Sequence, residues 1–263
     1  MSVVILQDEI VHYEVLGRGK PLIFLHGWVG SWRYWIPAMQ SASVSFRTYA
    51  LDLWGFGDSA KAANNYSLEQ QVNLVNLFTQ EMGIGRIALI GHGLGAIIAA
   101  LYAAQNPKWV DRILAVSLPE NNQSLHARLS TSPPAELADW LLNRSADSEP
   151  ARTEAPKTDP RAIQHSMTSL EQVDLNAMTQ NIGLPCLLVY GQNDPAVNAP
   201  VLQDQASTLP QHVHQIVFES SGHFPMLDES SKFNRLLADF LNLGSGESPR
   251  QLQLKDEWKR RVR

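Results

Sequence analysis

The chain has 263 residues, of which 44% are hydrophobic and 18% are charged, and its formal net charge is −5. This composition excludes wholesale disorder, and the acidic balance lacks the basic footprint of a nucleic-acid-binding protein. The single cysteine, Cys186, excludes an intrachain disulfide. Because there is neither a basic leader nor an apolar run of ~18 residues, we expect a cytoplasmic protein with no membrane partner.

Short apolar runs alternate with helical patterns along the chain, and several of the runs are apolar throughout. Such runs are typical of strands that are buried on both faces of a mainly parallel sheet. The pattern predicts strands at residues 10–16, 21–25, 48–53, 86–90, 113–118, 186–190 and 213–218.

Helical segments separate these strands. Ser67 followed by Gln70 forms a capping-box pattern, and apolar residues at helical spacing continue the helix to about Met82. Residues 95–105 are alanine-rich and helical, and residues 233–241 carry the apolar stripe of a late helix. The alternation predicts an α/β fold with a mainly parallel, doubly wound sheet and right-handed crossovers.

Residues 120–181 separate two predicted strands by far more than an ordinary connection. Within them we predict a short helix over 133–144 that carries Trp140, then a mobile loop over 145–160. A second helix is predicted over 159–172. An insertion of this length is usually a functional lid or a mobile segment.

The C-terminal tail differs from the rest of the chain in charge. Residues 249–263 hold six basic and two acidic residues, so they carry +4 and the remaining chain carries −9. An apolar stripe among these charges consists of Leu252, Leu254, Trp258 and Val262. Either the tail is solvated, or the stripe docks on the acidic body or on a second copy, as a homodimer. The predicted organisation is a core of residues 1–119 and 182–243, a cap of residues 120–181 and a basic tail of residues 244–263.

Residues 91–95, G-H-G-L-G, follow a predicted strand and precede a predicted helix. This is the setting of a nucleophile elbow, whose pattern is G-x-S-x-G, but the serine is absent. The outer glycines allow the chain to turn sharply and allow the helix to pack near the strand. Gly93 stands where a nucleophile would be raised from the sheet edge, and it offers no side chain.

An ordered set of motifs makes the chain similar to the α/β-hydrolase-fold superfamily, from Val3 to about Leu243. The matching segments are H-G-W at 26–28, D-L-W-G-F-G-D-S at 52–59, G-H-G-L-G at 91–95, G-Q-N-D at 191–194 and S-G-H at 221–223. Their order, with the nucleophile before the acid and the histidine last, is the order of the family. The resemblance implies the α/β-hydrolase fold with a small inserted cap.

The resemblance also implies a role for each site residue. His223 would act as general base and acid, because an imidazole titrates near neutrality. Asp194 would orient this imidazole and stabilise its protonated form. The backbone N–H groups of Trp28 and Leu94 would form the oxyanion hole. The missing part is covalent, since Gly93 supplies no Oγ for an acyl-enzyme.

Three explanations of Gly93 stay open. It is an introduced substitution that disarms an enzyme, or the chain is a natural binding or signalling protein, a pseudoenzyme. In the third, His223 activates a water directly or transfers protons without a covalent step. This route is slow, because loss of the triad nucleophile of a serine protease leaves roughly 10³–10⁴-fold catalysis over water. The leading hypothesis is an ester or lactone hydrolase that is inactive or nearly so in this form. Family branches with an aspartate nucleophile are disfavoured, because residue 93 is not aspartate either.

Aromatic residues gather where the resemblance places the ligand crevice, at the carboxyl ends of the strands. We expect a mainly apolar pocket under the cap, suited to a small apolar or aromatic molecule. The alternative is that half of these residues pack in the core. The predicted lining consists of His26, Trp32, Trp54, Phe56, His92, Trp140 and Phe224.

Other reactive residue types are expected to be structural. A lone histidine such as His12 rarely marks a metal site, and we expect no metal and no cofactor. Cys186 lies within an apolar strand and is expected to be an inert core thiol. Asp52 and Asp58 are expected to fix the turn after their strand.

Overall fold

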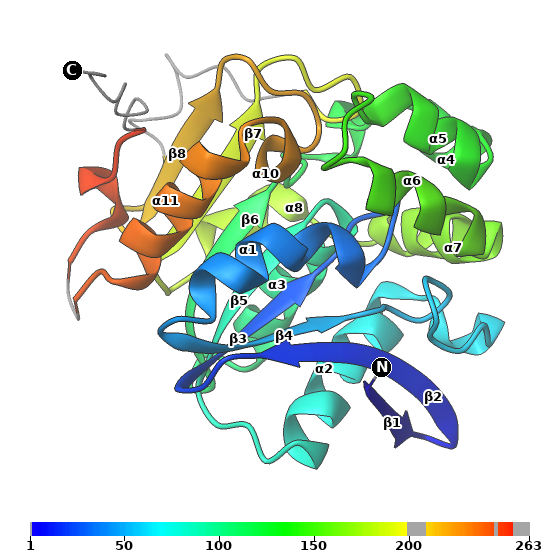
Figure 1. Cartoon of the computed structure of the whole chain (residues 1–263), viewed down its shortest axis with the longest axis horizontal. Helices are drawn as coiled ribbons and strands as arrows, with labels where there is room; N and C mark the ends of the chain where they lie inside the picture. The colour runs from blue at the N-terminus through cyan, green and yellow to red at the C-terminus, as the bar shows by residue number, and fades with distance from the viewer. Residues whose placement is uncertain (1, 199–208, 245–246, 255–263) are drawn as a thin grey trace.

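The computed structural model describes residues 2–198, 209–244 and 247–254 of the chain. Within these residues an eight-stranded sheet runs through the molecule in the order β1-β2-β4-β3-β5-β6-β7-β8 (Figure 1). The strands are β1 (Ser2–Leu6), β2 (Glu9–Leu16), β3 (Lys20–Leu25), β4 (Phe46–Leu51), β5 (Ile87–His92), β6 (Val110–Val116), β7 (Cys186–Gly191) and β8 (Val213–Phe218).

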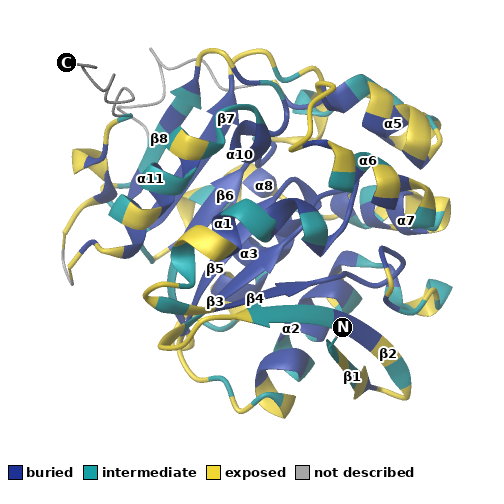
Figure 2. Cartoon of the chain, viewed as in Figure 1, coloured by how far each residue is buried: buried dark blue, intermediate teal, exposed yellow. Residues whose placement is uncertain are grey.

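The part of the sheet from β4 to β8 is parallel, whereas β1 and β2 form an antiparallel hairpin at one edge. Every residue of β5 and β7 is buried, as their uninterrupted apolar sequences require. The central strands accordingly form the dark interior of Figure 2. The predicted mainly parallel, doubly wound sheet is confirmed.

Helices cover both faces of this sheet. The two that contact each other on one face are α1 (Ile36–Ala42) and α11 (Ser230–Leu241), whose apolar stripe was predicted. On the other face α3 (Leu94–Gln105) contacts both α2 (Leu68–Glu81) and α8 (Leu175–Gln180). The side chain of Ser67 accepts a hydrogen bond from the Gln70 amide at 3.3 Å, so α2 begins where its capping pattern predicts.

The inserted segment is mostly helical, and its part up to Leu170 lies beyond the carboxyl edge of the parallel strands (Figure 1). Its helices are α4 (Arg128–Thr131), α5 (Pro134–Leu141), α6 (Glu149–Glu154), α7 (Pro160–Leu170) and α8, and a 3₁₀ turn spans Ala155–Lys157. The predicted helix after Asp159 is present, with the Asp159 side chain accepting from the Arg161 amide at 3.0 Å. Because α8 packs on α3, the end of the insertion belongs to the helical layer of the core.

Two expectations from the sequence need correction. Strand β1 was not predicted, and its register opposite β2 adds an antiparallel edge to the sheet. The segment expected to be a loop at residues 145–160 contains α6. A tertiary contact stabilises this polar helix, because the buried Glu154 pairs with Arg33 at 3.1 Å, in addition to its local pair with Lys157 at 3.0 Å. Arg33 is distant in the sequence, so helical periodicity does not reveal this contact.

The first part of the tail packs against the body of its own chain. Leu252 is buried, and its carbonyl lies 3.1 Å from His214 Nε2 on β8. The Arg250 guanidinium donates to the carbonyls of Leu209 and Pro210. Leu254, the next residue of the predicted docking stripe, is partly buried against the core, whereas Trp258 and Val262 lie outside the described residues.

Candidate active site

The elbow between β5 and α3 turns at Gly93, whose backbone has φ +50° and ψ −110°. A residue with a side chain is strained in this region of backbone conformation, whereas glycine adopts it without a steric penalty. A Cβ at position 93 would lie 3.2 Å from two ring carbons of Trp28, so a side chain there requires the indole to shift by a few tenths of an ångström. Gly95 is needed for a different reason, since a Cβ there would meet the Leu25 carbonyl oxygen at 2.3 Å.

Two loops at the carboxyl edge bring together the predicted histidine and acid. Asp194 follows β7, His223 follows β8, and these strands are adjacent in the sheet. His223 Nδ1 lies 2.8 Å from Asp194 Oδ2, and both side chains are buried. Since Asp194 occupies Nδ1, the Nε2 atom of His223 is left to face a substrate or a water.

The Asp194 carboxylate is held by more than the histidine. Its Oδ1 accepts from the amides of Ala196 at 2.8 Å and Val197 at 3.0 Å, and its Oδ2 also accepts from Ser117 Oγ at 2.9 Å. Burial would raise the pKa of Asp194, but the charge and hydrogen bond of His223 and the two amides outweigh it, so the pKa is lowered. The carboxylate therefore stays charged at neutral pH and can stabilise an imidazolium.

Ser117 is a site residue that sequence reasoning missed. It directly follows β6, is fully buried and has φ +50°, an uncommon conformation for a residue with a side chain. Its Oγ also lies 3.4 Å from the His223 carbonyl. No motif marks this serine, although its place after a buried strand that adjoins β7 is a signal that could have found it.

The two predicted oxyanion donors belong to residues at the elbow, since Leu94 directly follows Gly93 and the Trp28 ring lies against position 93. Leu94 is the first residue of α3, so its N–H has no acceptor within the helix. Among the described residues neither this amide nor that of Trp28 donates a backbone hydrogen bond in a turn or loop. The Trp28 indole is fixed from the cap, because its Nε1 donates to Ser166 Oγ on α7 at 3.1 Å.

The expected aromatic lining divides into two groups. The Phe224 and His92 rings lie next to His223, with centroids 5.2 Å and 4.5 Å from it. The Trp32 ring lies 5.8 Å from His12, and Trp140, which is half-buried in the cap, lies 5.1 Å from His126.

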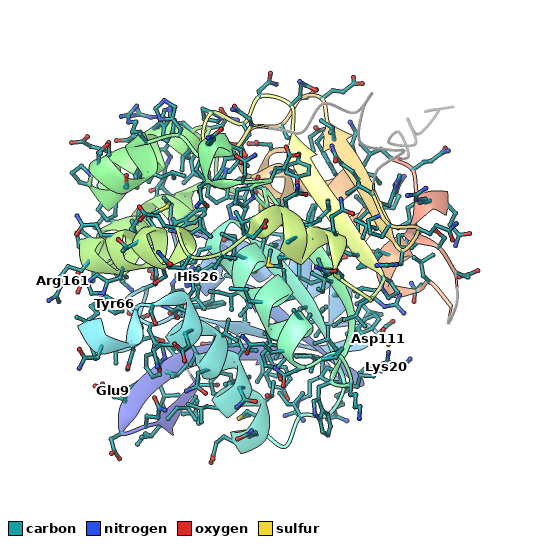
Figure 3. All side chains as sticks on the ribbon, turned by 180° about the vertical axis from the view of Figure 1, so that it is seen from behind. Glu9, Lys20, His26, Tyr66, Asp111 and Arg161 are labelled. Atoms are coloured by element: carbon teal, nitrogen blue, oxygen red, sulfur yellow. The ribbon has the colours of Figure 1, made fainter. Side chains whose placement is uncertain are left out.

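The remaining expected lining residues are buried in packing around the turn after β4. His26 Nε2 accepts from the Leu53 amide at 3.0 Å, and the His26 ring contacts Phe56 at 5.0 Å. The Trp54 amide donates to the Gln71 side chain at 3.0 Å. Burial lowers the pKa of His26, so this interior residue (Figure 3) acts as a neutral structural group.

A second histidine–aspartate pair lies away from the elbow. His12 Nδ1 is 2.9 Å from Asp52 Oδ2, and a carboxylate oxygen of Asp58 lies within 4.8 Å of both ligand atoms. Asp52 also accepts from the amides of Trp32 at 2.9 Å and Asp58 at 3.0 Å, and Asp58 pairs with Lys157. These oxygens thus hold the turn, as expected, rather than presenting an open set of metal ligands.

No replacement nucleophile stands at the elbow among the described residues. Cys186 is buried at the start of β7, and burial raises the pKa of its thiol to about 12. A thiol of this kind stays protonated and unreactive.

A surface groove of about 1200 Å³ lies at the opposite edge of the sheet, where Lys20 is exposed and Asp111 is half-buried (Figure 3). Its Arg112 side chain pairs with Asp111 and donates to three carbonyls at the end of α11. This groove is remote from the His223–Asp194 pair.

The model of the alpha/beta hydrolase fold family matches residues 20–149. Solved structures extend the likeness: that of an E-2-(acetamidomethylene)succinate hydrolase has a TM-score of 0.79 and 22% identity, over 92% of this chain and 98% of that one. The chain is an α/β-hydrolase-fold protein. Across the residues that the structure describes, none of the helices of this hydrolase-fold chain is both long and apolar enough to cross a membrane.

Other proteins similar to this hydrolase-fold chain include esterases and lactonases. A pimeloyl-[acyl-carrier protein] methyl ester esterase of Vibrio vulnificus is 24% identical over 88% of this chain and 97% of its own length. The enol-lactonase of Burkholderia xenovorans LB400 has a TM-score of 0.76 at 19% identity, over 92% of this chain and 100% of its own. A serine-to-glycine mutant of an N-acyl homoserine lactonase, complexed with N-hexanoyl homoserine lactone, has a TM-score of 0.78 at 20% identity, over 91% and 96%.

Proposed function

We propose that this chain is a hydrolase of small, largely apolar esters or lactones that lacks its covalent nucleophile. The observation that supports this most is the buried 2.8 Å contact between His223 and Asp194 at the carboxyl edge, next to an elbow without a side chain. The proton-transfer residues are ordered for catalysis, while Gly93 leaves nothing to acylate. In this form we expect the chain to be inactive or nearly so.

Any hydrolysis by the glycine form has to use water as the nucleophile. The water oxygen would bond to the carbonyl carbon while His223 Nε2 takes its proton and Asp194 stabilises the imidazolium. The amides of Trp28 and Leu94 would hold the developing oxyanion. Collapse of the intermediate breaks the bond to the leaving oxygen, to which His223 returns the proton, giving an acid and an alcohol.

The bond type and the surroundings support the proposed substrate class. Three of the similar proteins act, by their names, on a methyl ester, an enol-lactone and E-2-(acetamidomethylene)succinate, so ester-type bonds recur among them while the substrates differ. Phe224 and the indole of Trp28 give the elbow an apolar neighbourhood. An uncharged acyl group suits these surroundings better than a charged one.

Restoring the serine tests the proposal. The Gly93→Ser, Gly93→Ala and unchanged chains are compared on short p-nitrophenyl esters and on lactones, each with and without His223→Ala. We expect the serine form to gain about 10³-fold or more over the other two, and to lose the gain with His223→Ala. A folded serine form that is no faster than the alanine form on every ester and lactone would contradict it.

A second candidate function is binding without turnover. The observation that favours it is the Trp28 ring, which lies 3.2 Å from where a Cβ of residue 93 would stand and so fills part of the nucleophile's space. A related lactonase with a serine changed to glycine forms a complex with its lactone. Calorimetric titration of the unchanged chain with N-hexanoyl homoserine lactone, with and without Phe224→Ala, measures this binding. Saturable binding, no turnover and no gain in the serine form would favour the binder.

A further inference from the structure

A buried chain of hydrogen bonds joins three segments of the site through His92. The Gly27 amide lies 2.6 Å from Tyr34 Oη, this hydroxyl lies 2.9 Å from His92 Nδ1, and His92 Nε2 lies 2.9 Å from the His223 carbonyl oxygen. The amide at one end can only donate and the carbonyl at the other can only accept. The direction is therefore fixed: Tyr34 donates to Nδ1, and the ring carries its proton on Nε2.

Neither His92 nor Tyr34 can take part in proton transfer at neutral pH. His92 and Tyr34 are 0% and 1% exposed. Burial, reinforced by the nearby charge of His223, holds the pKa of His92 well below its ordinary value. Burial also raises the pKa of the Tyr34 hydroxyl well above its usual range. Both groups stay neutral, so their contribution has to be geometric.

The three segments that meet at His92 are the parts that have to be spaced correctly for catalysis. Gly27 precedes the oxyanion donor Trp28, His92 precedes Gly93, and the carbonyl belongs to the proposed base itself. Ring contacts complete the unit, with Phe224 at 4.6 Å from His92 and 5.4 Å from Tyr34. Side chains locked by packing and hydrogen bonds are what holds a site within the narrow tolerance that catalysis needs.

We propose that His92 and Tyr34 are positioning residues that set the spacing between the oxyanion loop and His223. The proposal rests on the proposed function for its catalytic meaning, but the spacing itself can be measured without activity. The competing interpretation is a buried polar pair that only stabilises the fold.

Tyr34→Phe separates the two interpretations, because it removes the hydroxyl and keeps the ring. In the Gly93→Ser form we expect kcat to fall about 10-fold with KM within twofold, the effect of losing one buried hydrogen bond. Tyr102→Phe is the matched control, since its buried hydroxyl lies 3.3 Å from Thr79 Oγ1 on α2, away from the elbow. It should lower the melting temperature but not kcat. Equal melting losses with unchanged kcat in both variants would overturn the proposal.

The second measurement uses the unchanged glycine chain and needs no turnover. Proton NMR follows the low-field signal of the hydrogen bond between His223 Nδ1 and Asp194. We expect Tyr34→Phe to shift this signal and Tyr102→Phe to leave it in place. If the serine form proves inactive, the proposed function fails while this shift still supports the positioning role. A signal that Tyr34→Phe does not move would reject it.

A change at His92 gives an independent variant of the same test. His92→Gln keeps a side-chain N–H that can donate to the His223 carbonyl, as Nε2 does, whereas His92→Ala removes this donor altogether. We expect it to retain more of the NMR signal position and of kcat than His92→Ala does. Equal losses in the glutamine and alanine variants would contradict a role that depends on the donor to His223.

Discussion

The two sides of the elbow differ in how completely they are built. On the proton-transfer side four donors converge on the buried Asp194 carboxylate, from His223, Ser117 and two backbone amides. On the nucleophile side the chain turns through Gly93, and the indole of Trp28 lies against the position that a side chain would take. Orientation and charge are thus distributed over several residues, whereas the nucleophile depends on a single one. One position can therefore remove covalent chemistry while the rest of the site keeps its shape.

The largest effect on kcat is expected from a change at Asp194, on the proton-transfer side of the elbow. In the Gly93→Ser form, Asp194→Asn should lower kcat about 10⁴-fold, as the equivalent change does in a serine protease, because an amide favours the wrong imidazole tautomer. Asp174→Asn is the control, since Asp174 accepts from the Ala177 amide at 2.9 Å and caps α8, far from the elbow. Ester hydrolysis measured under saturation gives both values. A kcat loss of less than tenfold for Asp194→Asn would mean that the carboxylate does not orient the histidine.

A smaller effect tests whether the nucleophile side is adapted to its glycine. A side chain at position 93 crowds Trp28 at 3.2 Å, so Gly93→Ser alone should destabilise the chain. Trp28→Phe provides room but loses the hydrogen bond to Ser166. In a double-mutant cycle we expect a favourable coupling of about 1 kcal/mol between the two changes. Urea unfolding of the four forms measures it.

The outcome of this cycle decides how well the two positions fit each other. Leu129→Ala, a buried cap residue changed in place of Trp28, serves as the control partner and should show no coupling to Gly93→Ser. If the effects of Trp28→Phe and Gly93→Ser on the free energy of unfolding are additive, the indole moves aside without cost. The position of the indole would then not depend on the glycine.

The sequence predicts the strands and loops that carry the site better than it predicts the residues that hold the site in place through hydrogen bonds. Continuous apolar runs identify β5 and β7, and the loops that follow them carry Gly93 and Asp194, because these features are local in the chain. Ser117 and Tyr34 act across 77 and 58 positions of sequence, so only the folded sheet order reveals them. Local patterns cannot show contacts that depend on which strands become neighbours.

The polar helix α6 was missed for the same reason. Periodicity finds helices by their apolar stripe, but α6 is held by Ala151 packing near Gly30 and by the ion pair of Glu154 with Arg33. The ring contact between Trp32 and His12, at 5.8 Å, likewise joins residues that are distant in the sequence and that no local pattern connects.

The smallest expected effect concerns the second histidine–aspartate pair, His12 and Asp52, which differs from His223 and Asp194 in what the carboxylate binds. His12 and Asp52 approach within 2.9 Å, almost as close as His223 and Asp194. The Asp52 oxygens, however, also accept hydrogen bonds from the backbone amides of Trp32 and Asp58. Burial would lower the pKa of His12, but the hydrogen bond and charge of Asp52, with Asp58 and Glu14, raise it above 6.5. This pair should stabilise the fold and leave catalysis alone.

The raised pKa fixes the sign of the pH dependence. A histidine whose pKa is higher in the folded state contributes its full stabilisation of the fold when the pH is below its unfolded-state pKa. This contribution is lost as the pH rises through the folded-state pKa. Between pH 6 and 8 the free energy of unfolding of the parent should therefore fall relative to that of His12→Gln, by up to about 1 kcal/mol. Urea unfolding at each pH gives both curves, and kcat of the Gly93→Ser form with His12→Gln should stay unchanged. Parallel stability curves would show that the pKa of His12 is the same in the folded and unfolded states, and that a short contact to a carboxylate does not by itself raise it.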